Sequence, residues 1–196
     1  MLTSGKDIAI VSDAGTPVIS DPGALLIQAI RDAGFNIIPI PGASAVSTLL
    51  SVAGVNADQY IFGGFFPKKK TEAQKWIEKV EKLDSPVVFF ESPKRLMATL
   101  DGLEETGNIQ YICVGKELTK TYETIIGGTI AEVKMKLASV PIKGEWCVVI
   151  QFVPQKSDMD MDILKTLIEQ RLDNKQIMAI GKKLGWPKNK LYTHLL

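Results

Sequence analysis

Two loops rich in glycine, serine, alanine and proline are the stretches of this sequence best suited to bind a ligand. They cover residues 12–23 and 41–45, and each lies between a short apolar stretch and a helical pattern. Gly15 and Gly23 permit backbone conformations that other residues avoid. Free N–H groups at a helix N-terminus attract a carboxylate or a phosphate. The loops therefore favour a nucleotide-like ligand, although the sequence has neither a G-x-G-x-x-G motif nor a P-loop lysine motif.

Strands and helices must hold these loops in place. We expect strands over 8–11 and 35–40, and helices over 22–33 and 44–54. Asp21 is suited to cap the first of these helices and Ser44 the second. Loops that join a strand to a helix are where α/β sheets place ligands. A sheet of only two strands would be marginal, so further strands must come from the rest of the chain or from another chain, unless the sequence is a fragment.

The composition is that of a folded protein with one large or two small domains. The chain has 196 residues, of which 45% are hydrophobic, and its net charge of +1 does not by itself indicate a nucleic-acid partner. Cys113 and Cys147 both lie in apolar stretches, which is typical of buried thiols in a reducing cytoplasm. His194 is the single histidine, which excludes catalysis by a histidine cluster and most histidine-rich metal sites.

The middle of the chain indicates a second α/β domain. Apolar strands are predicted over 60–62, where the strand runs into a Gly-Gly pair, and over 86–90, 109–114, 123–127 and 146–150. Two of them are nearly adjacent around residues 116–126, which predicts a mixed sheet. Thr71 with Gln74, and Thr129 with Glu132, have the spacing of capping boxes. Ser92 is expected to cap a further helix.

Lysines gather in two places that suit contact with phosphate groups. Residues 68–70 are three lysines, for which a solvated basic loop is the simpler interpretation and a phosphate-contacting edge the alternative. From residue 175 onward there are five lysines and no carboxylate side chain. The sequence pattern at this end of the chain predicts helices joined by a turn. These helices form either a small helical cap or a helix-turn-helix-like element that binds nucleic acid. The candidates for RNA contact are Lys68, Lys69, Lys70, Lys182, Lys183, Lys188 and Lys190.

Several motifs together resemble those of the ribosomal small-subunit RNA cytidine 2′-O-methyltransferases, a branch of the tetrapyrrole methylases. They lie at residues 12–23, 41–45, 64–67, 89–96, 116–123 and 144–145, with Lys116 where arginine is common in the family. The resemblance implies an α/β protein with two methylase domains, the first incomplete, over 1–58 and 59–154. A helical, lysine-rich extension follows over 155–196. In the family, a glycine-rich segment and a first strand–helix unit precede the first motif, so we expect an N-terminally truncated member.

The resemblance implies transfer of a methyl group from S-adenosylmethionine to a ribose 2′-hydroxyl of a cytidine in 16S ribosomal RNA, by a cytoplasmic homodimer. A ribose hydroxyl is a weak acid, so a base or a polarising cation would assist. Glu91, Glu117 and Lys120 lie on the family motifs and are the candidates, with a structural Glu117–Lys120 ion pair as the alternative. Candidate cofactor-binding residues are Asp13, Ala14, Gly15, Thr16, Ser44, Ala45, Phe90 and Gly144. No metal site is expected.

Two other functions remain open from the sequence. One is a small-molecule methylase that acts on a tetrapyrrole-like substrate. The other is a non-enzymatic fragment that binds nucleic acid through its lysine-rich end.

Overall fold

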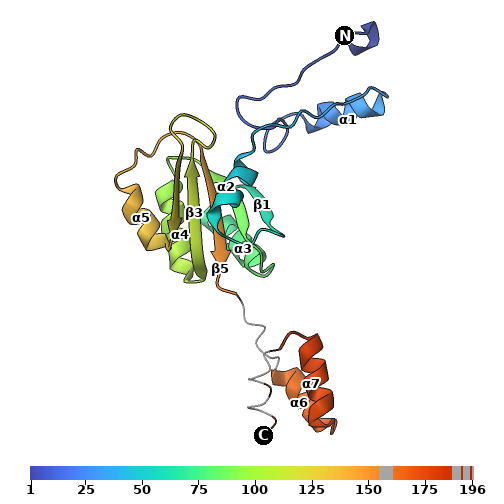
Figure 1. Cartoon of the computed structure of the whole chain (residues 1–196), viewed down its shortest axis with the longest axis vertical. Helices are drawn as coiled ribbons and strands as arrows, with labels where there is room; N and C mark the ends of the chain where they lie inside the picture. The colour runs from blue at the N-terminus through green and yellow to red at the C-terminus, as the bar shows by residue number, and fades with distance from the viewer. Residues whose placement is uncertain (155–160, 187–190, 192–194, 196) are drawn as a thin grey trace. The chain divides into compact units, whose positions relative to one another are not determined.

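The computed structural model describes the chain except for residues 155–160, 187–190, 192–194 and 196 (Figure 1). It divides into two compact units, residues 1–153 and 154–196. The division of the first unit at residue 58 stays a prediction. Among the described residues, no helix combines the length and the apolar character needed to cross a membrane.

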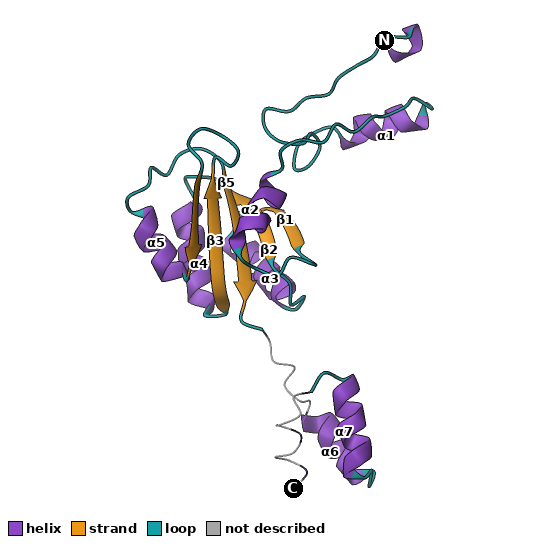
Figure 2. Ribbon diagram, viewed as in Figure 1, coloured by secondary structure: helices purple, strands orange, loops and turns teal. Residues whose placement is uncertain are grey.

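A mixed five-stranded sheet forms the centre of the first unit (Figure 2). Its strands are β1 (Ile61–Phe65), β2 (Val87–Glu91), β3 (Ile109–Lys116), β4 (Thr124–Gly128) and β5 (Trp146–Phe152), in the order β1-β2-β5-β3-β4. β1 and β2 are parallel, whereas β5 is antiparallel to both β2 and β3, and β4 is antiparallel to β3. The α/β class and the mixed sheet predicted from the sequence are confirmed.

Each face of the sheet carries its own apolar cluster. Helices α3 (Lys70–Glu81), α4 (Leu96–Thr106) and α5 (Ile130–Leu137) pack on one face, and α2 (Ala45–Ala53) packs on the other. Because side chains alternate along a strand, Val148 faces the three helices while Cys147 faces α2. The packing of Leu49 and Leu50 of α2 against Val149 of β5 fixes this helix on the sheet.

The N-terminal part of the first unit differs from the sequence prediction. Residues 1–43 contain a short 3-10 helix (Leu2–Ser4) and the helix α1 (Ala24–Asp32) but no strand. The strands expected over 8–11 and 35–40 are therefore wrong, because neither segment pairs with any of the five strands and a strand exists only through such pairing. The apolar side chains remain exposed instead, Val11 by 85% and Ile40 by 80%.

Two helix caps follow the prediction. Thr129 and Glu132 form the capping box of α5, in which each side chain accepts a hydrogen bond from the backbone N–H of the other residue. Ser44 caps α2, since its Oγ accepts from the N–H of Ser47. Both caps depend only on residues three positions apart, so the local sequence decides them.

Three other predicted caps are wrong. Asp21 makes no capping hydrogen bond, because α1 begins after Gly23. Helix α3 already begins at Lys70, one residue before Thr71, and no side chain caps it. Ser92 lies before a turn, in which its carbonyl accepts from the N–H groups of Arg95 and Leu96, and α4 starts at Leu96.

The second unit is a small helical module. Helices α6 (Met161–Glu169) and α7 (Asn174–Lys183) share an apolar core that contains Leu164, Ile177 and Trp186. Asp173 forms a capping box with Gln176 at the start of α7. The further helix expected around residues 188–192 falls largely outside the described residues.

Candidate functional site

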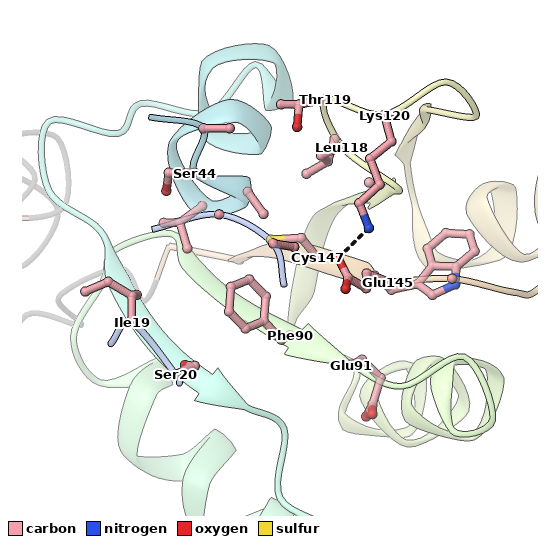
Figure 3. Close-up of a pocket in the computed structure, with 18 of the residues that line it drawn as sticks. Ile19, Ser20, Ser44, Phe90, Glu91, Leu118, Thr119, Lys120, Glu145 and Cys147 are labelled. Carbon is pink, nitrogen blue, oxygen red and sulfur yellow. Dashed lines mark hydrogen bonds and ion pairs between the residues drawn. The ribbon is translucent and has the colours of Figure 1, made fainter. Parts of the chain in front are cut away.

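A cavity of about 530 Å³ opens in the first unit where both glycine-rich loops meet the ends of β2 and β5 (Figure 3). This volume is typical of pockets that bind small molecules. The residues that the sequence singled out for cofactor binding all line it, namely Asp13, Ala14, Gly15, Thr16, Ser44, Ala45, Phe90 and Gly144. Positions that lie as far apart as 13 and 144 in the chain therefore surround one space.

The two loops are joined by a side chain. The Oγ1 of Thr16 donates to the carbonyl of Ala43 at 3.5 Å, a contact across 27 positions. The Oγ of Ser12 lies 3.2 Å from the carbonyl of Ala14 and 3.1 Å from that of Gly15, which tightens the first loop. Gly15 has a φ of 73°, in the left-handed region that favours glycine. The backbone of the first loop thus forms one wall of the cavity.

The N-terminus of α2 forms a second wall. In any α-helix the first N–H groups lack a partner within the helix, and Ala45 and Val46 at the start of α2 both line the cavity. Ser44, the N-cap, lines it as well. The helix therefore presents free N–H groups and the positive end of its dipole, which suit a carboxylate.

The floor of the cavity is apolar. Phe90 of β2 and Cys147 of β5 are paired across the two strands, and both line the cavity (Figure 3). The Phe90 ring packs edge-on against Phe62 and Phe65, with centroid distances of 5.2 and 5.6 Å. Burial raises the pKa of the Cys147 thiol to about 12. The thiol therefore stays neutral, and the floor carries no charge.

Lys120 and Glu145 line the cavity, and Glu117 lies next to them. Lys120 Nζ is 2.9 Å from Glu145 Oε2 (Figure 3). The same Nζ is 3.4 Å from Glu117 Oε1. The backbone N–H of Glu145 also donates to Glu117 Oε1 at 2.8 Å. That N–H and the Lys120 ammonium lower the pKa of Glu117, while the hydrogen bond to Glu145 raises the pKa of Lys120. Both groups are therefore charged at neutral pH, so Lys120 acts as a cation rather than as a base.

The loop that carries Lys120 has an unusual backbone. Glu117 and Thr119 have φ values of 48° and 67°, in the left-handed region that non-glycine residues rarely adopt. The N–H of Thr119 donates to Glu123 Oε2 at 2.7 Å, which holds the turn closed. Conformations of this kind concentrate at functional sites.

Glu91 is held by a network beneath the cavity. Its buried carboxylate forms an ion pair with the Arg95 guanidinium at 2.5 Å and accepts a hydrogen bond from the Thr99 hydroxyl at 2.6 Å. Arg95 also donates to the carbonyls of Phe66 and Pro67, so the network ties β1 to the start of α4. Although Glu91 lines the cavity, its carboxylate is directed toward α4 (Figure 3). These contacts favour a structural carboxylate over a base.

The lysines proposed for RNA contact lie in two separate units. Lys68, Lys69 and Lys70 are exposed at the start of α3, where Lys69 pairs with Glu72 and Lys70 with Glu105. Lys182 and Lys183 are exposed in the last turn of α7. Lys188 and Lys190 lie outside the described residues.

Sequence reasoning missed some of the residues that line the cavity, among them Leu118, Thr119, Glu145 and Cys147. The sequence could have indicated Glu145, because this residue directly follows Gly144 in one of the motifs. No sequence pattern indicated Cys147, because a cysteine in an apolar strand is usually only a core residue.

Comparison with known proteins identifies the family. Residues 1–134 match the family model described as Tetrapyrrole (Corrin/Porphyrin) Methylases. Ribosomal RNA small subunit methyltransferase I of Haemophilus influenzae is 38% identical over 201 residues, which cover 97% of this chain and 71% of that protein. The chain belongs to the tetrapyrrole methylase family, in its ribosomal RNA small subunit methyltransferase I branch. The resemblance seen in the sequence motifs is thereby confirmed.

Further comparisons place this methylase among its relatives. The protein of the same name from Escherichia coli O157:H7 is 35% identical over 202 residues, which cover 100% of this chain and 71% of that protein. Among solved structures, the methyltransferase CobJ superposes with a TM-score of 0.51 at 16% identity, over 71% of this chain and 62% of that one. This likeness confirms the methylase fold.

Proposed function

We propose that this methylase transfers a methyl group from S-adenosylmethionine to a ribose 2′-hydroxyl of a cytidine in 16S ribosomal RNA. The observation that carries the proposal is the convergence of both glycine-rich loops and the α2 N-terminus on one cavity of about 530 Å³. Relatives with 35–38% identity are named ribosomal RNA small subunit methyltransferase I, which supports the choice of substrate.

The cavity residues fit the chemical parts of the proposed cofactor. The free N–H groups at the start of α2 suit its carboxylate. The Phe90 ring and the neutral Cys147 thiol suit the flat adenine. Asp13 lines the same cavity and provides a carboxylate for the cationic part of the ligand. When bound, the cofactor supplies a methyl carbon that a ribose oxygen can attack, while the carbon–sulfur electron pair leaves on sulfur.

Lys120 is the residue best placed to assist the attacking hydroxyl. Glu145 and Glu117 keep it protonated at the rim of the cavity. A fixed ammonium stabilises the negative charge that develops on the ribose oxygen as it attacks the methyl carbon, and the hydroxyl proton passes to solvent water. Glu117 is a weak base, because its pKa is lowered. We therefore assign Lys120 to charge stabilisation and Glu117 to the positioning of Lys120.

Two experiments test the proposal, first a measurement of cofactor binding and then an assay of methyl transfer to small ribosomal subunits. Calorimetric titration with S-adenosylmethionine and with S-adenosylhomocysteine is expected to give micromolar affinity, about −8 kcal/mol. Small subunits that lack the modification are then incubated with the protein and the cofactor, and the modified nucleotide is mapped by mass spectrometry. We expect one methyl group on the ribose of a cytidine. Transfer of the methyl group to a nucleobase would contradict the proposal. Transfer to a tetrapyrrole without transfer to small subunits would contradict it as well.

The proposal includes a homodimer. Its support is the exposed apolar surface of the N-terminal segment, which includes Val11, Leu25 and Ile40. Exposed apolar patches often mark surfaces that bind another protein. Sedimentation velocity is expected to give twice the monomer mass of 21.5 kDa, and a single monomeric species would contradict this part of the proposal.

A further inference from the structure

A second groove lies beside the cavity. It has a volume of about 610 Å³ and is lined by the ends of β3 and β4, by the loop between them (residues 117–123) and by the segment 139–144, which precedes β5. Gly144 lines both spaces. Glu117 lines the groove, whereas its ion-pair partner Lys120 lines the cavity. The Glu117–Lys120 pair therefore marks the boundary between the two.

Lys116 gives this groove a buried positive charge. The residue is only 8% exposed and lines the groove. Its ammonium makes no ion pair or hydrogen bond with any residue that the structure describes, although its charge contributes weakly to the lowered pKa of the adjacent Glu117. A buried cation is costly unless it is paired with an anion. Lys116 therefore favours an anionic ligand in this groove.

Tyr122 adds an exposed aromatic surface at the same place. Its side chain lines the groove and is 77% exposed, although large aromatic side chains usually bury their rings. Lys143, in the segment before β5, also lines the groove and is exposed. The groove thus combines a ring with two cations, which is the combination that proteins use to hold single-stranded nucleic acid.

The carboxylates of the groove do not oppose an anionic ligand strongly, because each is already engaged. Glu117 accepts from the Glu145 N–H at 2.8 Å and pairs with Lys120. Glu123 accepts from the Thr119 N–H at 2.7 Å.

We propose that this groove binds the substrate RNA strand next to the target nucleotide, with Tyr122 stacked on a base and Lys116 and Lys143 contacting the phosphate. This inference rests on the proposed function, because the RNA that reaches the groove is the methyl acceptor. The shared boundary at Glu117 and Lys120 then places the strand beside the cavity that would hold the methyl donor.

The test uses the full chain with Tyr122→Ala, Lys116→Met and Lys143→Met. Binding of a fluorescently labelled single-stranded oligonucleotide with the sequence around the target cytidine is measured at several salt concentrations. Tyr122→Ala is expected to weaken binding by about tenfold to a hundredfold. Each lysine variant is expected to reduce the slope of log K against log salt by about 0.7. The KM for small subunits should rise, and the affinity for S-adenosylmethionine should stay within about twofold.

Tyr60→Ala and Lys136→Met are matched controls, because neither residue lines the groove or the cavity. Both controls are expected to bind RNA as the wild type does. If the three groove variants bind RNA and turn over like the controls, the inference is overturned. It is also overturned if they lose affinity for S-adenosylmethionine to the same extent, since the effect would then be a general loss of structure.

A different result would overturn the proposed function without overturning the inference about the groove. A wild-type protein that transfers no methyl group to subunits would overturn the proposed function. The inference about the groove would still be supported if Tyr122→Ala weakened binding of the oligonucleotide relative to Tyr60→Ala.

Discussion

Gly144 lies directly against the carboxylate of Glu117, although 27 positions separate them in the chain. A Cβ added to Gly144 would lie 2.5 Å from Glu117 Oε1 and 2.7 Å from its Cγ. Gly144 also has a φ of 80°, which disfavours any other residue. The requirement for glycine here is therefore both steric and conformational, and it protects the contacts that Glu117 makes with Lys120 and Glu145.

Gly144→Ala is expected to displace Glu117 and thereby to release Lys120. The backbone strain should cost about 1–3 kcal/mol of unfolding free energy, and the turnover number should fall by about tenfold or more, because Lys120 loses a fixed position. Urea unfolding and a methyl-transfer assay measure the two effects. Gly102→Ala is the control, because a Cβ there meets nothing within 4 Å and Gly102 lies inside α4. That variant should be slightly more stable and fully active; equal activity of Gly144→Ala would contradict the model of Lys120 positioning.

Lys120→Met is expected to reduce the turnover number by about a hundredfold or more, since a single preorganised charge-stabilising group is worth that much in many enzymes. The affinity for S-adenosylmethionine should change far less. Lys134→Met is the matched control, because Lys134 also bridges two carboxylates, Asp101 and Glu104, away from the cavity. If steady-state kinetics show the same loss of turnover number for both variants, Lys120 has no role in the chemical step.

Glu91→Gln separates a structural role from a catalytic one. We expect it to destabilise the fold by about 2–4 kcal/mol, because it leaves Arg95 without its carboxylate partner in a mostly buried network. The turnover number of the folded fraction should be little changed. Glu104→Gln, at an exposed ion pair, should cost at most about 1 kcal/mol. A large loss of turnover with normal stability would instead make Glu91 a catalytic base.

Cys147 is expected to make stability depend on alkaline pH. Burial raises its pKa from the ordinary 9.0 to about 12 in the folded state. Its stabilising contribution is therefore complete below about pH 9 and is lost as the pH rises through about 12. Between about pH 8 and pH 11, the wild type should lose on the order of 2 kcal/mol more unfolding free energy than Cys147→Ala. Parallel curves for the two proteins would show that the thiol is not buried as described.

Local patterns were sufficient where the contacts are local. The capping box of Thr129 and Glu132 spans three positions, and the sequence predicted it correctly. The strands of the central sheet were predicted for a similar reason, because long apolar stretches bounded by turn residues have few alternatives. The same reasoning failed for residues 8–11 and 35–40, which are apolar but pair with none of the five strands. Whether an apolar stretch becomes a strand depends on a partner elsewhere, which periodicity cannot reveal.

By itself, the sequence determined the class of fold, the family motifs and ten of the 24 residues that line the cavity, because these depend on residue type and on short spacing. Only the tertiary structure decided how those residues combine. Lys120 meets Glu145 across 25 positions, and Glu117 accepts from the Glu145 N–H across 28, because the strand order brings β5 beside β3. The second groove likewise joins Lys116 at the end of β3 and Tyr122 of the following loop to residues 139–144, which lie more than 15 positions further along the chain. Long-range pairing fixes such contacts, and no local pattern in the chain encodes it.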